Sequence, residues 1–172
     1  MTEQEPRHSP AGNAATALIL EAFRFHGALI QAGDALTAAL GLTSARWQVI
    51  GAIALAGVPL PVAQIARNMG RARQSVQRVV NELEAAGLLA FANNPNHRRA
   101  KLVGLTDAGR AAYRATTARQ VPWSNELAAG LAPEAIEAAL DVVQALRHRL
   151  EDTDTRPAPT AAPPRKRKAT RP

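Results

Sequence analysis

Apolar residues recur at helical spacing along most of the chain. Between residues 14 and 40 an apolar side chain returns every three or four positions without an intervening proline, which predicts one long amphipathic helix. The same spacing, interrupted at glycines and prolines, predicts five further helices. Their expected ranges are about 44–56, 62–68, 72–86, 106–129 and 133–150.

The helices expected at 62–68 and 72–86 should pack as a pair. They are separated only by a short turn that contains Gly70, and each carries apolar residues on one face. The residues that would join them are Ile65 and Met69 from the first helix and Val76, Val79, Val80 and Leu83 from the second. This arrangement predicts a helix-turn-helix.

The apolar period changes after the helix pair. Residues 88–92 and 100–105 are short apolar stretches on either side of the polar segment 93–98, which predicts a two-stranded β-hairpin with a basic tip. The predicted fold class is mostly α with a small β-hairpin wing. The apolar stripes from Leu18 to Leu40 and from Ile136 to Leu150 exceed what one small domain can cover, so we expect a dimer.

Composition excludes several classes of protein. The absence of cysteine excludes disulfides, thiolate metal sites and thiol-based sensing within this chain. No apolar run reaches the roughly 20 residues that a membrane span requires. The first ten residues are polar rather than a signal peptide, so we expect a cytoplasmic protein that does not bind membranes.

The net charge of +7 is concentrated in two parts of the chain. Six basic residues and no acidic residue lie from residue 155 to the end, and residues 67–114 carry nine basic and three acidic residues. A basic central segment suits a surface that binds phosphates, because release of counterions from nucleic acid supplies much of the affinity. An ordinary solvated basic face is the alternative.

The helix expected at 72–86 has a polar face suited to reading bases. Arginine and amide side chains match the edges of guanine and adenine in the major groove. This face consists of Arg73, Gln74, Gln77, Arg78 and Asn81. An ordinary helix surface would contain more Glu and Lys pairs, whereas the two acids here, Glu82 and Glu84, come only near the end.

The hairpin supplies a second basic element. Arg98 and Arg99 at its tip could enter the minor groove, and Lys101 could contact phosphates, although a solvated turn would have the same composition. No catalytic arrangement accompanies these elements: the histidines are scattered, and neither a phosphate-binding loop nor a paired metal-ligand motif occurs. We therefore expect no enzyme activity, no cofactor and no metal.

The order of these elements and several motifs resemble the MarR family of winged helix-turn-helix transcription regulators. The wing followed by Leu-Thr-x-x-Gly is the most characteristic motif, and the resemblance covers about residues 14–150. The matching segments are Leu42–Trp47, Gln64–Ala66, Ser75–Val80, Leu83–Leu88 and Asn94–Gly109. The wing differs from the family pattern, because Asn94, Asn96 and His97 replace the usual acid near its tip and its first strand has no arginine.

The resemblance implies a homodimer bound to double-stranded DNA. In such a dimer the first, fifth and sixth helices intertwine, the fourth helix enters the major groove, and a wing arginine reaches the minor groove. The expected DNA contacts are Arg71, Arg73, Gln74, Ser75, Gln77, Arg78, Asn81, Arg98, Arg99 and Lys101. The expected organisation is one domain at 13–152 between a disordered tail at 1–12 and a disordered basic tail at 153–172. Within the domain we expect a DNA-binding core at about 43–106 and dimerisation helices at about 14–40 and 107–150.

The resemblance also implies a small aromatic or phenolic ligand. Such ligands bind between the dimerisation helices and the DNA-binding part, which here could involve Phe25, His26, Arg46 and Trp47, although such residues more often belong to the core or to a helix surface. The leading hypothesis is a dimeric repressor of a palindromic operator, either constitutive or released by a ligand. The alternatives are a nucleoid-type protein of low sequence specificity, suggested by the basic tail, and a protein-interaction module.

Overall fold

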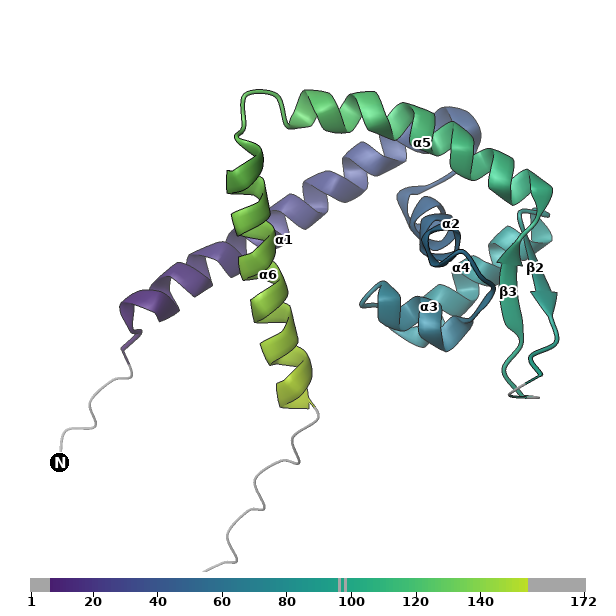
Figure 1. Cartoon of the computed structure of the whole chain (residues 1–172), viewed down its shortest axis with the longest axis horizontal. Coiled ribbons are helices and arrows are strands. Elements are labelled where there is room, and N and C mark those ends of the chain that lie inside the picture. Colours follow the sequence, from purple (N-terminus) through teal and green to yellow (C-terminus); the bar gives the residue numbers. More distant parts are fainter. Residues whose placement is uncertain (1–6, 96, 98, 155–172) are drawn as a thin grey trace, which may run out of the picture. The chain divides into compact units, whose positions relative to one another are not determined.

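The structure is a computed structural model of the chain and describes residues 7–95, 97 and 99–154. The chain divides into two units, Met1–Leu127 and Ala128–Pro172. The second contains α6 (Pro133–Asp154). The first contains α1 (Pro10–Thr37), α2 (Ser44–Ala56), α3 (Val62–Asn68), α4 (Arg73–Ala85), α5 (Asp107–Leu127) and three strands (Figure 1). The predicted fold, mostly helical with a small sheet, is confirmed.

Helix α1 begins earlier than its apolar periodicity predicts. The Ser9 hydroxyl accepts a hydrogen bond from the Gly12 N–H at 3.0 Å, and Pro10 occupies the first turn, where a missing N–H costs nothing. Residues 10–12, expected in the N-terminal tail, therefore belong to α1. Residues 153 and 154, expected in the C-terminal tail, complete α6, and residues 155–172 lie outside the described residues.

The sheet has three strands rather than the two of the predicted hairpin. Strand β3 (Leu102–Leu105) is central and pairs antiparallel with β2 (Leu89–Ala92) on one side and with β1 (Leu60–Pro61) on the other. Strand β1 has only two residues, one of them a proline, so it is too short to show a period of two. Pro61 is tolerated there because β1 is an edge strand.

The hydrophobic core lies around α2, which packs against α1, α3, α4, α5 and β3. Helix α2 contributes Val49, Ile50 and Ile53, all buried. The other buried apolar residues are Leu42, Val62, Ile65, Ala66, Val76, Val80, Leu83, Leu89 and Val103. The core is therefore aliphatic and joins the helix pair α3–α4 to the sheet, so that the helix pair and the sheet pack on one common core.

The beginning of α5 is fixed to the corner between α4 and β2. The Thr106 N–H donates to the Leu88 carbonyl at 3.1 Å, and the Thr106 hydroxyl accepts from the Gly109 N–H at 3.0 Å, which caps the helix. Gly109 is buried, and a Cβ atom there would overlap with the Leu88 carbonyl oxygen. The Leu-Thr-x-x-Gly motif thus combines a helix cap with a close backbone approach.

Candidate nucleic-acid interface

The apolar face of helix α4 fixes the helix in the core. Val76, Val80 and Leu83 are buried against α2 and α3, and the turn that precedes the helix is allowed by Gly70, whose φ is +59°. The opposite face carries the polar residues that the sequence singles out for base reading. Because the apolar face is fixed in the core, the direction in which this polar face points is fixed as well.

The outer face of α4 presents amides and one prominent arginine. The side chain of Arg78 is 80% exposed, and Gln74 and Asn81 are exposed beside it. The Gln77 side-chain amide donates to Oδ1 of Asn81 at 2.8 Å, so these two amides are already oriented relative to each other. An arginine beside oriented amides offers the donors and acceptors that direct readout of base edges requires.

One flank of α4 meets the wing. Arg73 and Gln77 line a cavity of about 360 Å³ together with Arg99 and Lys101 from the wing and the beginning of α3. The Lys101 ammonium lies 5.8 Å from the centre of the Phe91 ring, which helps to hold this cation on the sheet. The structure therefore brings two predicted groove residues and two predicted wing residues to one concave surface.

The other flank of α4 faces α2. Arg71, Ser75 and Arg78 line a small cavity of about 90 Å³ together with Ala45 and Val49. Beside it the Glu82 carboxylate lies between Arg46 of α2 and Arg78, an arrangement that the sequence analysis missed. Arg46 and Glu82 are 36 residues apart, so no local pattern could have indicated their contact.

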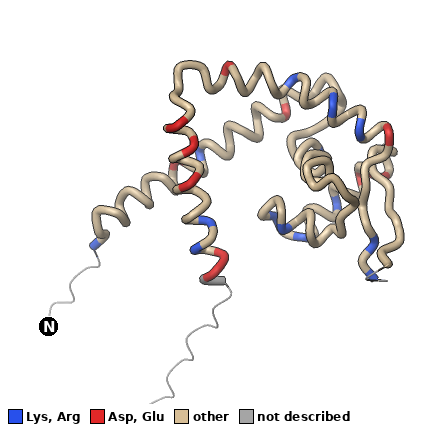
Figure 2. The backbone as a smooth tube through the Cα atoms, viewed as in Figure 1, with Lys and Arg blue, Asp and Glu red and all other residues tan. Residues whose placement is uncertain are grey.

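The wing carries basic residues at its end. Arg99 is exposed, whereas Arg98 and Asn96 lie outside the described residues. Figure 2 shows that Lys and Arg also occur along the α3–α4 pair. The described cations of the wing and of α4 belong to the same unit of the chain.

The structure does not gather the predicted ligand residues in one place. Phe25 and His26 are exposed on α1, and Arg46 pairs with Glu82. Trp47 lines a cavity of about 690 Å³ between α2, the end of α3 and α5. This cavity contains no other predicted ligand residue, but the residues that line it include Gln48, Tyr113 and Gln120.

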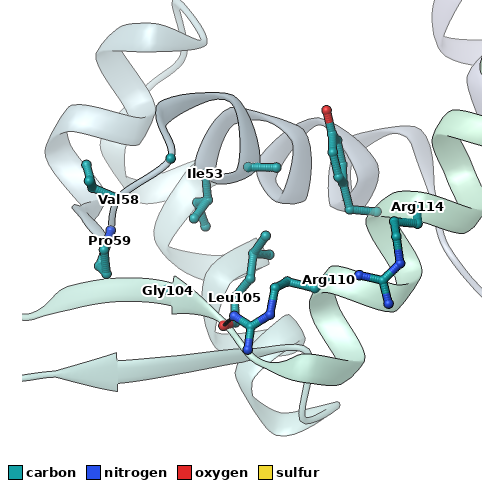
Figure 3. Close-up of a pocket in the computed structure, with 10 residues that line it drawn as sticks. Ile53, Val58, Pro59, Gly104, Leu105, Arg110 and Arg114 are labelled. Carbon is teal, nitrogen blue, oxygen red and sulfur yellow. Dashed lines mark hydrogen bonds between the residues drawn. The ribbon is translucent and has the colours of Figure 1, made fainter.

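A second cavity of about 390 Å³ lies between the end of α2, β3 and the beginning of α5 (Figure 3). Arg110 and Arg114 project from α5 on one side of it. The Arg110 guanidinium donates a hydrogen bond to the Leu105 carbonyl at 2.7 Å and forms a salt bridge with Asp107. It therefore connects the end of β3 to the first turn of α5. We therefore assign Arg110 a structural role.

Two other kinds of feature do not occur in the described part of the chain. No cluster of three or more His, Cys, Asp or Glu side chains among residues 7–95, 97 and 99–154 could hold a metal ion. No single helix in those ranges has both the length and the apolar composition of a membrane span. The pair of segments Pro10–Leu40 and Ser44–Ala56 meets these criteria when the two are taken together, but they are bent by 84° relative to each other. The first segment is α1 extended by the 3₁₀ turn Ala38–Leu40, and the second is α2.

Known proteins share both the sequence and the fold of this chain. A family model described as MarR family matches residues 40–100. Uncharacterized protein Rv2011c of Mycobacterium tuberculosis is 37% identical over 124 residues, which cover 72% of this chain and 85% of that protein. Sco5413, a MarR family transcriptional regulator from Streptomyces coelicolor, is 26% identical with a TM-score of 0.68, and the match covers 81% of this chain and 96% of Sco5413.

A further structural match is BpsR of Bordetella bronchiseptica, whose DNA binding is regulated by 6-hydroxynicotinic acid. It is 24% identical with a TM-score of 0.63, and the match covers 78% of this chain and 98% of BpsR. Proteins of the matched family are DNA-binding transcription regulators rather than enzymes. The sequence matches, the winged helix-turn-helix and the structural matches agree, and this chain belongs to the MarR family of transcription regulators.

Proposed function

We propose that the protein is a dimeric, sequence-specific repressor that binds a palindromic operator. The observation that carries this proposal is the outer face of α4, where an exposed arginine and oriented amides stand on a helix whose other face is buried in the core. Direct readout of DNA bases requires such donors and acceptors on a helix whose position in the protein is fixed. The wing cations beside Arg73 would hold the phosphate backbone on one flank of this helix.

The exposed apolar residues of α1 and α6 support a homodimer. Phe23 and Phe25 of α1 are 72% and 54% exposed, and Leu140 and Leu150 of α6 are 53% and 71% exposed. Burying such side chains between two copies of the chain would remove apolar surface from water, which is the main driving force of obligate association. A two-fold dimer presents two α4 helices, and this symmetry is the reason to expect a palindromic site.

The test selects preferred duplexes from a random library with the full-length protein and then measures affinity over several salt concentrations. Arg78→Ala should lower operator affinity by about 1–3 kcal/mol and relax the preference at one base pair of each half-site. Arg99→Ala should weaken binding to all sequences more evenly and reduce the salt dependence. Arg119→Ala, which removes an exposed arginine of α5 outside this surface, is the matched control.

The same experiment separates the alternatives. A wild-type protein that binds every duplex equally would be a nucleoid-type protein, and one that binds no duplex would use the fold to bind another protein. Repression itself is tested by placing the selected operator in a reporter promoter, where the wild-type protein should lower transcription and Arg78→Ala should not.

We also propose that a small aromatic ligand binds in the cavity beside Trp47. Its volume of about 690 Å³ lies within the usual range of ligand pockets, and Gln48, Tyr113 and Gln120 supply polar groups along an otherwise largely apolar lining. The regulation of BpsR by 6-hydroxynicotinic acid supports a ligand of this class.

Trp47 supplies the signal for this second test. In a Trp123→Phe background, 6-hydroxynicotinate and 4-hydroxybenzoate are titrated while Trp47 fluorescence and operator binding are followed. A ligand of this cavity should change the fluorescence, and Gln120→Ala should weaken the effect, whereas Gln31→Ala, which removes an exposed amide of α1 outside the cavity, should not. Unchanged fluorescence at millimolar concentrations of both compounds would refute the assignment of this ligand class.

A further inference from the structure

Glu82 connects two arginines that come from different helices. On one side its Oε2 atom accepts from Nε and Nη2 of Arg46 in α2, at 3.3 and 3.2 Å. On the other side its Oε1 atom lies 3.8 Å from Nε of Arg78, one turn earlier in α4. A single carboxylate thus lies between Arg46 of α2, in the packed part of this unit, and Arg78, an exposed arginine on the outer face of α4.

The two contacts differ in how firmly they are held. The side chain of Arg46 is only 32% exposed, follows the Thr43 cap of α2 and donates two hydrogen bonds to the Glu82 carboxylate. Arg78 is 80% exposed and has a long side chain with many rotamers in water. The Arg46–Glu82 pair can therefore act as the fixed partner that restricts Arg78.

The closest approach of Arg78 to Glu82 is between Nε and Oε1, at 3.8 Å, which is longer than a hydrogen bond. A guanidinium carries five N–H donors, and a paired contact with O6 and N7 of guanine uses two of them. The charge contact with Glu82 therefore orients Arg78 without using up the donors that a base would need. We propose that Glu82 positions Arg78 for base reading and that Arg46 fixes Glu82 for this task, an inference that rests on the proposed function.

The charge of Glu82 has a second effect, on overall affinity. A carboxylate at the edge of the DNA-facing surface repels the phosphates of every sequence, so it lowers the affinity for operator and non-specific duplexes alike. This repulsion leaves the ratio of specific to non-specific binding unchanged. Only the effect that acts through Arg78 depends on the base and raises this ratio.

These two effects are separated by comparing Glu82→Gln with Glu84→Gln. Both variants remove one negative charge from α4, but no contact joins Glu84 to Arg78 in the described residues, so it is the matched control. Both should raise non-specific affinity to a similar degree. Only Glu82→Gln, and likewise Arg46→Gln, should lower discrimination by about 3- to 10-fold at the base pair that Arg78→Ala affects.

Double variants test whether Glu82 acts through Arg78. In an Arg78→Ala background, Glu82→Gln should change discrimination at that base pair no further, because the positioned group is gone. If Glu82→Gln lowers affinity for all sequences equally, or lowers discrimination equally without Arg78, it has only a structural role and the proposal is wrong. Circular dichroism and urea denaturation show whether each variant is folded.

A measurement without DNA tests the positioning itself. In ¹⁵N relaxation of the free protein, the Arg78 Nε–H group should be more mobile in Glu82→Gln than in the wild type, and unchanged in Glu84→Gln. Equal mobility in all three proteins would overturn this inference alone. A wild-type protein that selects no sequence would overturn the proposed function and this inference with it.

Discussion

Replacing Gly109 by alanine tests how α5 is joined to the DNA-binding unit. The added Cβ atom would overlap with the Leu88 carbonyl oxygen and lie 3.1 Å from the Leu88 carbonyl carbon and 3.3 Å from Cδ2 of Leu105. The Leu88 carbonyl cannot turn away freely, because it accepts the Thr106 N–H at 3.1 Å. Either this hydrogen bond or the packing of α5 must give way.

The expected cost is the difference between opposing effects. Alanine normally stabilises a helix by about 0.5–1 kcal/mol relative to glycine. Overpacking of a tight site costs about 1–3 kcal/mol, and weakening the Thr106–Leu88 hydrogen bond adds about 0.5–1.5 kcal/mol. We therefore expect Gly109→Ala to lower the free energy of unfolding by about 1–3 kcal/mol.

Urea denaturation followed by circular dichroism measures this change, at one protein concentration because unfolding of a dimer depends on concentration. Gly51→Ala in α2 is the matched control, since a Cβ atom there would meet nothing within 4 Å. It should leave stability unchanged or raise it by up to about 1 kcal/mol. If Gly109→Ala is as stable as the wild type, the close approach of α5 to Leu88 is not a constraint and the reasoning fails.

Three further predictions concern the dimer, the basic tail and a buried hydroxyl. Leu140→Asp should convert a dimer to a monomer in sedimentation experiments, and a wild-type monomer at micromolar concentration would contradict the proposed dimer. Deletion of residues 155–172 should lower non-specific affinity and its salt dependence but keep the operator preference, so a lost preference would contradict this role. Thr37→Val should lower the free energy of unfolding by about 1 kcal/mol, because the buried hydroxyl lies within hydrogen-bond distance of the carbonyls of Gly33 and Leu42 and donates its one proton to either of them. Unchanged stability in urea would show that these carbonyls find other partners.

Much of the helical framework could be predicted because its determinants are local. Helix α3 has the predicted bounds, and the caps at Thr43 and Thr106 follow from hydroxyl side chains directly before apolar periodicity. The core could also be predicted, since Val76, Val80 and Leu83 repeat at helical spacing and are all buried. These features require only neighbours in the sequence.

The features that could not be predicted depend on residues far apart in the chain. Strand β1 exists because Leu60 and Pro61 pair with β3, some forty residues later. The Arg46–Glu82 pair and the cavity beside Trp47 likewise arise only when α2, α4 and α5 are packed. At the candidate site, the sequence therefore indicated which polar residues α4 would carry but not which of them share a partner.

The pairing of β1 with β3 determines which parts of the chain can change length independently. Only residues 57–59 lie between α2 and β1, so an inserted residue must either bulge out of this short connection or shift Leu60 away from Val103 and reverse the faces of β1. Insertions between Ala92 and Leu102 would leave all three strands in register. Related proteins can therefore evolve wings of different length while the part that carries α4 stays the same.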